Sequence, residues 1–91
     1  MEPHIKLRDG YHWVEDPGTS PYQHTRWLVF ADGETRADAF LVEVEFDPDD
    51  KNSWEMFIYN EVETGDFEQV YSLEEVREHY ATKGGLCPFD I

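Results

Sequence analysis

Carboxylate side chains are the residues of this sequence whose number and spacing most clearly suggest a chemical role. Asp and Glu supply 21 of the 91 residues against 7 Lys and Arg, which gives a formal net charge of -14 at pH 7. In the second half of the chain several of them stand at alternate positions, the spacing that points side chains to one face of a β-strand. If such strands are neighbours in a sheet, their carboxylates form one acidic surface.

An acidic surface of this kind attracts basic proteins and repels phosphates. Carboxylates at alternate strand positions lie about 6.6 Å apart, a spacing comparable with that of successive phosphates along a nucleic-acid strand. Binding to nucleic acid or to anionic lipid depends instead on Lys and Arg, which are scarce here. We therefore expect no direct binding to nucleic acid or membrane, and we expect a basic protein partner that itself binds nucleic acid.

The elements that must position these carboxylates are predicted from hydrophobic patterning. Alternating apolar residues over residues 5–15 predict a β-hairpin around Asp9-Gly10. Residues 16–25 are interrupted by Pro and Gly, which predicts a loop. Further strands are predicted over residues 26–31, 40–46, 54–60 and 67–71.

A helix is predicted after the last strand. Ser72-Leu73-Glu74-Glu75 matches a capping box, Lys83-Gly84-Gly85 ends the helix, and its apolar stripe includes Val76 and Tyr80. The order of elements predicts an α+β fold, an antiparallel β-sheet built from hairpins with a single C-terminal α-helix packed on one face. We expect one acidic domain over residues 1–91.

Burial of the apolar faces predicts which residues lie opposite each other, because a one-residue slip would turn every side chain over. In the central hairpin Val44 is paired with Met56, which places Glu45 opposite Glu55. The same register pairs Phe46 with Trp54, Val42 with Ile58, and Glu43 with Phe57, and leaves Phe40 on the apolar face. Like charges directly opposite each other destabilise a sheet, so the Glu45 and Glu55 pair suggests a use other than folding.

The following hairpin is predicted to extend the acidic face. A two-residue turn at Thr64-Gly65 pairs Val62 with Phe67 and Ile58 with Tyr71. If the helix covers the Ile58 face, the opposite face of the three strands is acidic without a basic residue to interrupt it. Its apolar members, Leu41, Phe57, Tyr59 and Val70, would act as anchors for a partner.

These patterns predict a site and a class of function. The predicted partner-binding residues are Glu43, Glu45, Glu55, Phe57, Tyr59, Glu61, Glu63, Asp66 and Glu68. In size, charge and face pattern the chain resembles the DNA-mimic inhibitors carried by phages and mobile elements, among them anti-CRISPR and anti-restriction proteins. The resemblance implies an acidic inhibitor, monomeric or homodimeric, that blocks a basic nucleic-acid-handling protein by presenting a phosphate-mimicking sheet face.

Three other interpretations remain open at this point. An immunity protein that neutralises a cognate nuclease toxin would use the same electrostatics. A small enzyme or ligand-binding domain would use the aromatic-rich residues 11–27 and would need a concave pocket with convergent polar groups. Finally, the acidic face could be a solvated surface, of the kind that is general in proteins of salt-adapted organisms.

No catalytic, metal or cofactor site is assigned. Cys87 and His79 are the one nucleophile and base that could act as a couple, and neither stands in a family pattern. Glu75 and His79 lie four apart and are interpreted as a helix pair. The single cysteine cannot form an internal disulfide, and no apolar run of about 18 residues occurs. We therefore expect a cytoplasmic protein that is not an enzyme.

Overall fold

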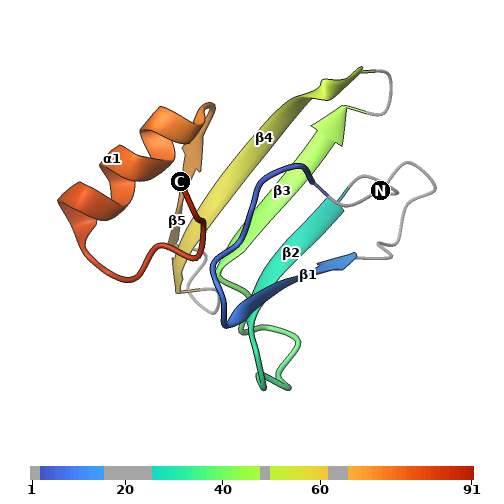
Figure 1. The fold of residues 1–91 in the computed structure, drawn as a ribbon, viewed down its shortest axis with the longest axis vertical. Coiled ribbons are helices and arrows are strands. Elements are labelled where there is room, and N and C mark those ends of the chain that lie inside the picture. Colours follow the sequence, from blue (N-terminus) through green and yellow to red (C-terminus); the bar gives the residue numbers. More distant parts are fainter. Residues whose placement is uncertain (1–2, 16–25, 48–49, 62–65) are drawn as a thin grey trace.

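The computed structural model describes residues 3–15, 26–47, 50–61 and 66–91, with the backbone alone for 46, 47, 50–53, 60 and 61. It contains one antiparallel sheet of five strands in the order β1-β2-β3-β4-β5, followed by one helix, α1 (Figure 1). The elements are β1 Tyr11–Glu15, β2 Arg26–Ala31, β3 Val42–Asp47, β4 Asp50–Glu61, β5 Asp66–Val70 and α1 Leu73–Lys83. The predicted α+β fold of hairpins with one C-terminal helix is therefore confirmed.

The central hairpin has the predicted register. Val44 lies opposite Met56 and Glu45 opposite Glu55, with the other predicted pairs also in place. Both Val44 and Met56 are fully buried, so burial of apolar side chains fixes the register here, as the alternation predicts. The strand itself begins at Val42, so the prediction that Phe40 continues its apolar face is wrong.

The predicted register of the last hairpin is wrong. Ile58 lies opposite Glu68, three positions before the predicted Tyr71. The pairing also contains an irregularity between Tyr59 and Glu61, which is typical of a β-bulge. Side chains along a strand alternate between the two faces of the sheet. A shift of three positions therefore turns every side chain of β5 to the face opposite to the one predicted.

The physical reason for the inverted β5 is the burial of Val70. Val70 is almost fully buried on the side of α1, whereas Tyr71 is 63% exposed. The sheet thus buries a β-branched residue and leaves the amphipathic tyrosine at the surface. As a consequence Phe67 faces away from the helix, and Glu68 faces toward it, contrary to the prediction.

The N-terminal hairpin is also predicted incorrectly. The chain does turn at Asp9-Gly10, where Gly10 has a φ of 98° that favours glycine. The segment before this turn, however, pairs with the C-terminal segment, through a bridge between Leu7 and Phe89. Two backbone hydrogen bonds flank the bridge, from Arg8 N to Pro88 O at 2.9 Å and from Asp90 N to Lys6 O at 2.9 Å.

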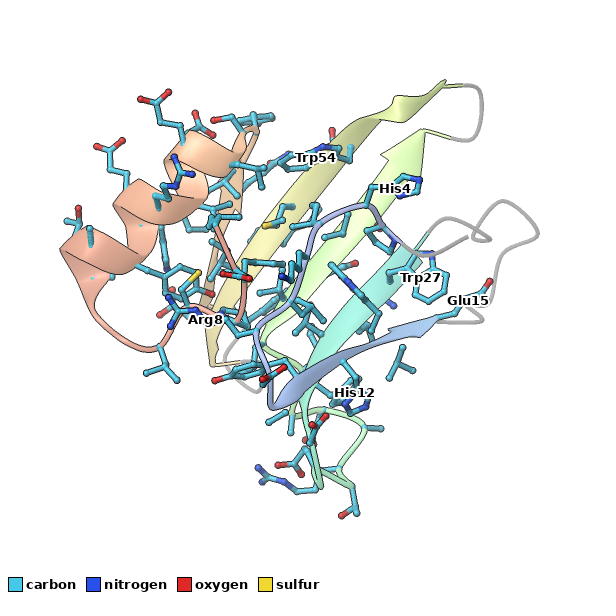
Figure 2. All side chains as sticks on the ribbon, viewed as in Figure 1. His4, Arg8, His12, Glu15, Trp27 and Trp54 are labelled. Atoms are coloured by element: carbon cyan, nitrogen blue, oxygen red, sulfur yellow. The ribbon has the colours of Figure 1, made fainter. Side chains whose placement is uncertain are left out.

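The helix and the two terminal segments together cover one face of the sheet (Figures 1 and 2). Phe89 is fully buried and Ile5 is nearly so, and the Ile5 carbonyl accepts a hydrogen bond from Trp13 Nε1 at 3.3 Å. The long-range burial of Ile5 and Phe89 explains why residues 5–8 leave the sheet. The core consists of Ile5, Val29, Val42, Val44, Met56, Ile58, Val70, Val76 and Phe89.

The helix begins as the capping box predicts. Ser72 Oγ accepts a hydrogen bond from Glu75 N at 3.2 Å, as predicted, whereas the Glu75 carboxylate accepts one from Tyr71 N, one residue before the cap that the capping box predicts as its partner. Gly84 follows the helix with a φ of 78°. In the part of the chain that the structure describes, no helix is long and apolar enough to cross a membrane.

Candidate protein-binding face

The face of the sheet opposite α1 carries the candidate site, and we refer to it as the open face. The strand registers assign side chains to it from all five strands. Its described strand residues are His12, Val14, Arg26, Leu28, Phe30, Glu43, Glu45, Glu55, Phe57, Tyr59, Phe67 and Gln69. The face is therefore a mixture of carboxylates and rings, with one arginine among them.

Five of the nine predicted site residues share the open face: Glu43, Glu45, Glu55, Phe57 and Tyr59. Of the others, Asp66 and Glu68 lie on strand β5, whose inverted register turns Glu68 toward the helix. Asp66 stands two positions from Glu68, so strand alternation gives it the same direction. For Glu61 only the backbone is described, and Glu63 lies outside the described residues.

Glu43 is a buried carboxylate at the centre of the face, with 6% of its surface exposed. Arg26 donates from Nε to Glu43 Oε1, and the Tyr59 hydroxyl donates to Glu43 Oε2 at 3.4 Å. The described open-face residues of β3, β4 and β5 include no Lys or Arg, as predicted, but the adjacent strand β2 brings Arg26 to Glu43, which the sequence did not predict. A buried charge requires a partner, and strand β2 supplies it, since it pairs Arg26 beside Glu45 and Leu28 beside Glu43.

Glu45 and Glu55 are the described predicted carboxylates that remain available on the open face. Glu55 is exposed and Glu45 is half-buried. Burial raises the pKa of Glu45 above its ordinary value, the neighbouring Glu43 and Glu55 raise it further, and Arg26 opposes these effects. The Glu45 carboxylate thus lies in a negative local environment, which a cation brought by a partner would relieve.

Aromatic rings form a continuous row across the open face, and we refer to it as the aromatic row. Neighbouring ring centroids lie 6.3 Å apart for Phe30 and Phe40, 4.9 Å for Phe40 and Tyr59, and 5.3 Å for Tyr59 and Phe67. Phe57 joins it at 5.6 Å from Phe67. Phe67 is 49% exposed, so the β5 end of the row is open to solvent.

Sequence patterning identified Phe57 and Tyr59 but missed the remaining rings of the row. Phe67 was assigned to the helix side because of the wrong register. Phe40 was assigned there because it stands two positions before Val42, although it precedes the strand. Phe30 lies in an unbroken apolar run, which gives no indication of which face it occupies.

Glu68 has a structural role on the helix side of the sheet. Its Oε2 lies 2.6 Å from His79 Nδ1, and the His79 side chain is 2% exposed. The interaction joins β5 to α1, and it differs from the predicted helix pair of Glu75 with His79. Within the described residues, no group of three or more His, Cys, Asp and Glu side chains could hold a metal ion.

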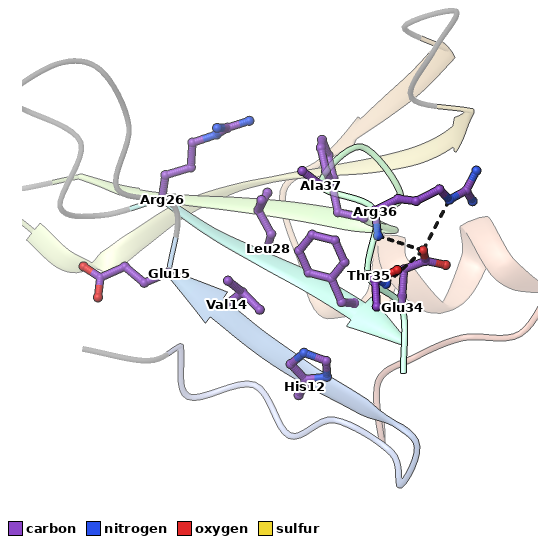
Figure 3. Close-up of a pocket in the computed structure, with 11 residues that line it drawn as sticks. His12, Val14, Glu15, Arg26, Leu28, Glu34, Thr35, Arg36 and Ala37 are labelled. Atoms are coloured by element: carbon purple, nitrogen blue, oxygen red, sulfur yellow. Dashed lines mark hydrogen bonds and ion pairs between the residues drawn. The ribbon is translucent and has the colours of Figure 1, made fainter. Parts of the chain in front are cut away.

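A pocket of about 440 Å³ occupies the β1 and β2 end of the open face (Figure 3). Its apolar lining includes Val14, Leu28, Phe30 and Phe40, and charged side chains stand around it. The pocket meets the aromatic row at Phe30 and Phe40, so the two features form one surface.

Comparisons of the chain with protein-family models, curated proteins and solved structures found no match. Function is therefore inferred from the geometry and charge of the open face.

Proposed function

We propose that this protein binds a basic protein partner through its open face and thereby blocks that partner from nucleic acid. One observation carries the proposal: the β5 end of the aromatic row, where Phe67 is 49% exposed and Phe57 and Tyr59 are half-buried, shares the open face with the carboxylates of Glu45 and Glu55. These rings and carboxylates belong to a chain with a net charge of -14. Such a surface offers both apolar anchors and charge complementary to Lys and Arg.

The rings would supply most of the binding energy. Aromatic side chains bury 150–250 Å² each, and a few such residues commonly dominate the energetics of an interface. Phe67 is a half-exposed ring on a sheet face that the helix does not cover. Its burial by a partner would remove apolar surface from water without disturbing the core.

The carboxylates would mainly direct the partner to this face. Complementary charge raises association rates, which fall as salt screens it. Fewer carboxylates can mimic phosphates than the sequence predicts, because Glu43 is paired with Arg26 and Glu68 is paired with His79. Among the described predicted residues, phosphate mimicry depends on Glu45 and Glu55.

The proposal covers two kinds of partner that the surface alone does not separate. One is a cellular protein that handles nucleic acid, as expected for an inhibitor of the anti-CRISPR or anti-restriction type. The other is a cognate nuclease toxin, as expected for an immunity protein. Their identification by mass spectrometry after affinity capture distinguishes the two, since a toxin is one dedicated protein.

Affinity capture from a cell lysate tests the proposal when matched variants are compared. We expect the protein to retain basic nucleic-acid-binding proteins at low salt and to retain fewer at high salt. The double variant Glu45→Gln, Glu55→Gln should retain less of them, and so should Phe67→Ala. The controls are Glu74→Gln, Glu78→Gln and Leu86→Ala, which change exposed residues outside the open face.

The controls decide which surface binds. Equal loss in the helix variant and the open-face variant would mean that net charge alone retains the proteins, which contradicts the proposal. Tight, salt-sensitive binding of purified protein to DNA or RNA would contradict it as well, because the carboxylates should repel phosphates.

A further inference from the structure

We infer that the pocket on the open face receives an aromatic side chain of the partner, flanked in the partner's sequence by Lys or Arg. This inference rests on the proposed function and names the kind of segment that is recognised. It is carried by three features of the pocket: an apolar floor, the Arg36 guanidinium at the rim, and an excess of carboxylates over arginines around it.

The floor is apolar and is already shaped by rings. Leu28 and Phe30 are each 8% exposed, while Val14 is exposed. Phe30 and Phe40 meet edge to face, at an interplanar angle of 71°. A further ring can add to such a pair in the same geometry, which is favourable beyond the apolar area that the ring buries.

An exposed guanidinium group at the rim, hydrogen-bonded at its Nε, favours a ring over an aliphatic chain. Glu34 Oε1 accepts hydrogen bonds from Thr35 N at 3.1 Å, from Arg36 N at 3.0 Å and from Arg36 Nε at 3.3 Å. The two hydrogen bonds from Arg36 are the main reason that the pKa of Glu34 lies below its ordinary value. The Arg36 guanidinium is thus tied at Nε, and its planar face can stack on an aromatic ring.

The charge around the pocket favours cationic residues next to that ring. Two carboxylates line the pocket, Glu15 and Glu34, and they balance its two arginines. Two further carboxylates contact lining residues: Glu43 accepts a hydrogen bond from Arg26 Nε, and Asp32 Oδ1 lies 2.8 Å from His12 Nδ1. Together with these partners, the described charges at the pocket are four carboxylates against two arginines. Figure 3 shows Glu15 at one end of the pocket and Glu34, hydrogen-bonded to Arg36, at the other.

The pocket and the exposed end of the aromatic row can contact the same partner. The row runs from Phe30 on β2 to Phe67 on β5, which is three strand spacings, or about 14 Å. A distance of this size fits within a standard interface of about 800 Å² per partner. The pocket would hold one anchor while the exposed end of the row contacts a second.

Binding of short peptides to the ¹⁵N-labelled full chain tests the inference by NMR. The probes are a pentapeptide with Trp between two pairs of Lys, the same peptide with Ala in place of Trp, and free indole. We expect the Trp peptide to shift the amide signals of Val14, Thr35 and Arg36. Its half-saturation concentration should be about tenfold lower than that of the Ala peptide, and indole alone should bind more weakly than the Trp peptide.

A pair of matched variants locates the binding site without a change of charge. Ala37→Trp fills the pocket from its exposed rim and should remove the preference for the Trp peptide. Ala81→Trp places the same side chain on the exposed surface of α1 and should leave the preference intact. Thermal unfolding of both variants checks that the fold is retained.

The outcomes separate the inference from the proposed function. If both peptides bind equally, with shifts confined to Glu45 and Glu55, the pocket inference is wrong while binding of a basic partner survives. Indole binding as tight as that of the Trp peptide would overturn the inference in favour of a small-molecule site. If neither peptide shifts a signal of the open face, the proposed function fails together with the inference.

Discussion

Glu43 is a residue whose role follows from its neighbours more than from its own charge. It stands in a cross-strand row with Leu28 and Phe57 on either side, so it is buried by apolar side chains. An ionised carboxylate in such a position requires compensation, which Arg26 and Tyr59 supply. Glu43 therefore positions other residues of the open face and has no exposed carboxylate to offer a partner.

Glu45 is the opposite case, a carboxylate whose ionisation lowers the free energy of unfolding. Because its pKa is raised in the folded state, the unfolded chain releases this proton first as pH increases. Below the ordinary carboxyl pKa both states are protonated and Glu45 has no effect. As the pH rises through the window between the ordinary and the raised pKa, Glu45 lowers the free energy of unfolding, and the loss is complete once the pH is above the raised pKa.

We predict that Glu45→Gln stabilises the protein at pH 7 by up to about 1 kcal/mol, the scale of a like-charge pair across strands. The gain should disappear at pH 3. Urea unfolding at both pH values measures it, with Glu78→Gln as a control for the change in net charge. A Glu45→Gln variant that is less stable at pH 7 would contradict the environment inferred for this residue.

At the scale of the elements, the contact between α1 and β5 gives one predicted binding residue, Glu68, a structural role. His79 is buried on the helix, and Glu68 is its partner on the edge strand. The Glu68 side chain is 47% exposed, so the cost of removing it, about 1–3 kcal/mol, comes from the buried His79, which loses its hydrogen-bond partner. Glu68 was predicted to bind the partner, and its observed place assigns it to this attachment.

We therefore predict that Glu68→Ala lowers the free energy of unfolding by about 1–3 kcal/mol and speeds hydrogen exchange of the α1 amides. Retention of basic partners should stay within about twofold of the original protein. Hydrogen exchange and affinity capture are measured on the same variant. Glu74→Ala, at an exposed position of the helix, serves as the control for the loss of one charge. If the variant loses partner retention while hydrogen exchange of the α1 amides is unchanged, Glu68 contacts the partner and the structural role is wrong.

The accuracy of the sequence-based predictions depended on how locally each element is determined. The register of β3 with β4 follows from clean alternation, and the start of α1 follows from Ser72 and Glu75, so both were predicted correctly. The register of β5 depends on an irregularity near Glu61, which alternation does not reveal. The role of Arg26 depends on the pairing of β2 with β3. The course of residues 5–8 depends on a contact with Phe89. Both of these contacts are long-range, so local patterning does not predict them.

At the scale of the whole molecule, net charge acts on folding and on binding in opposite directions. A charge of -14 on 91 residues repels itself in the compact state, and salt screens this repulsion over about 10 Å at 0.1 M. The same screening weakens attraction to a basic partner. Added salt should therefore stabilise the fold while it slows association.

We predict that raising NaCl from about 0.05 M to 0.5 M increases the midpoint of thermal unfolding and reduces the association rate with the Trp peptide or a captured partner by at least about tenfold. Differential scanning calorimetry and stopped-flow fluorescence measure the two effects. Sucrose, which strengthens burial without screening charge, is the control: it should raise the unfolding midpoint and leave the association rate nearly unchanged after correction for viscosity. A protein that unfolds at 0.1 M NaCl and folds only in molar salt would have an acidic surface adapted to salt. The carboxylates of the open face would then need no partner to explain them.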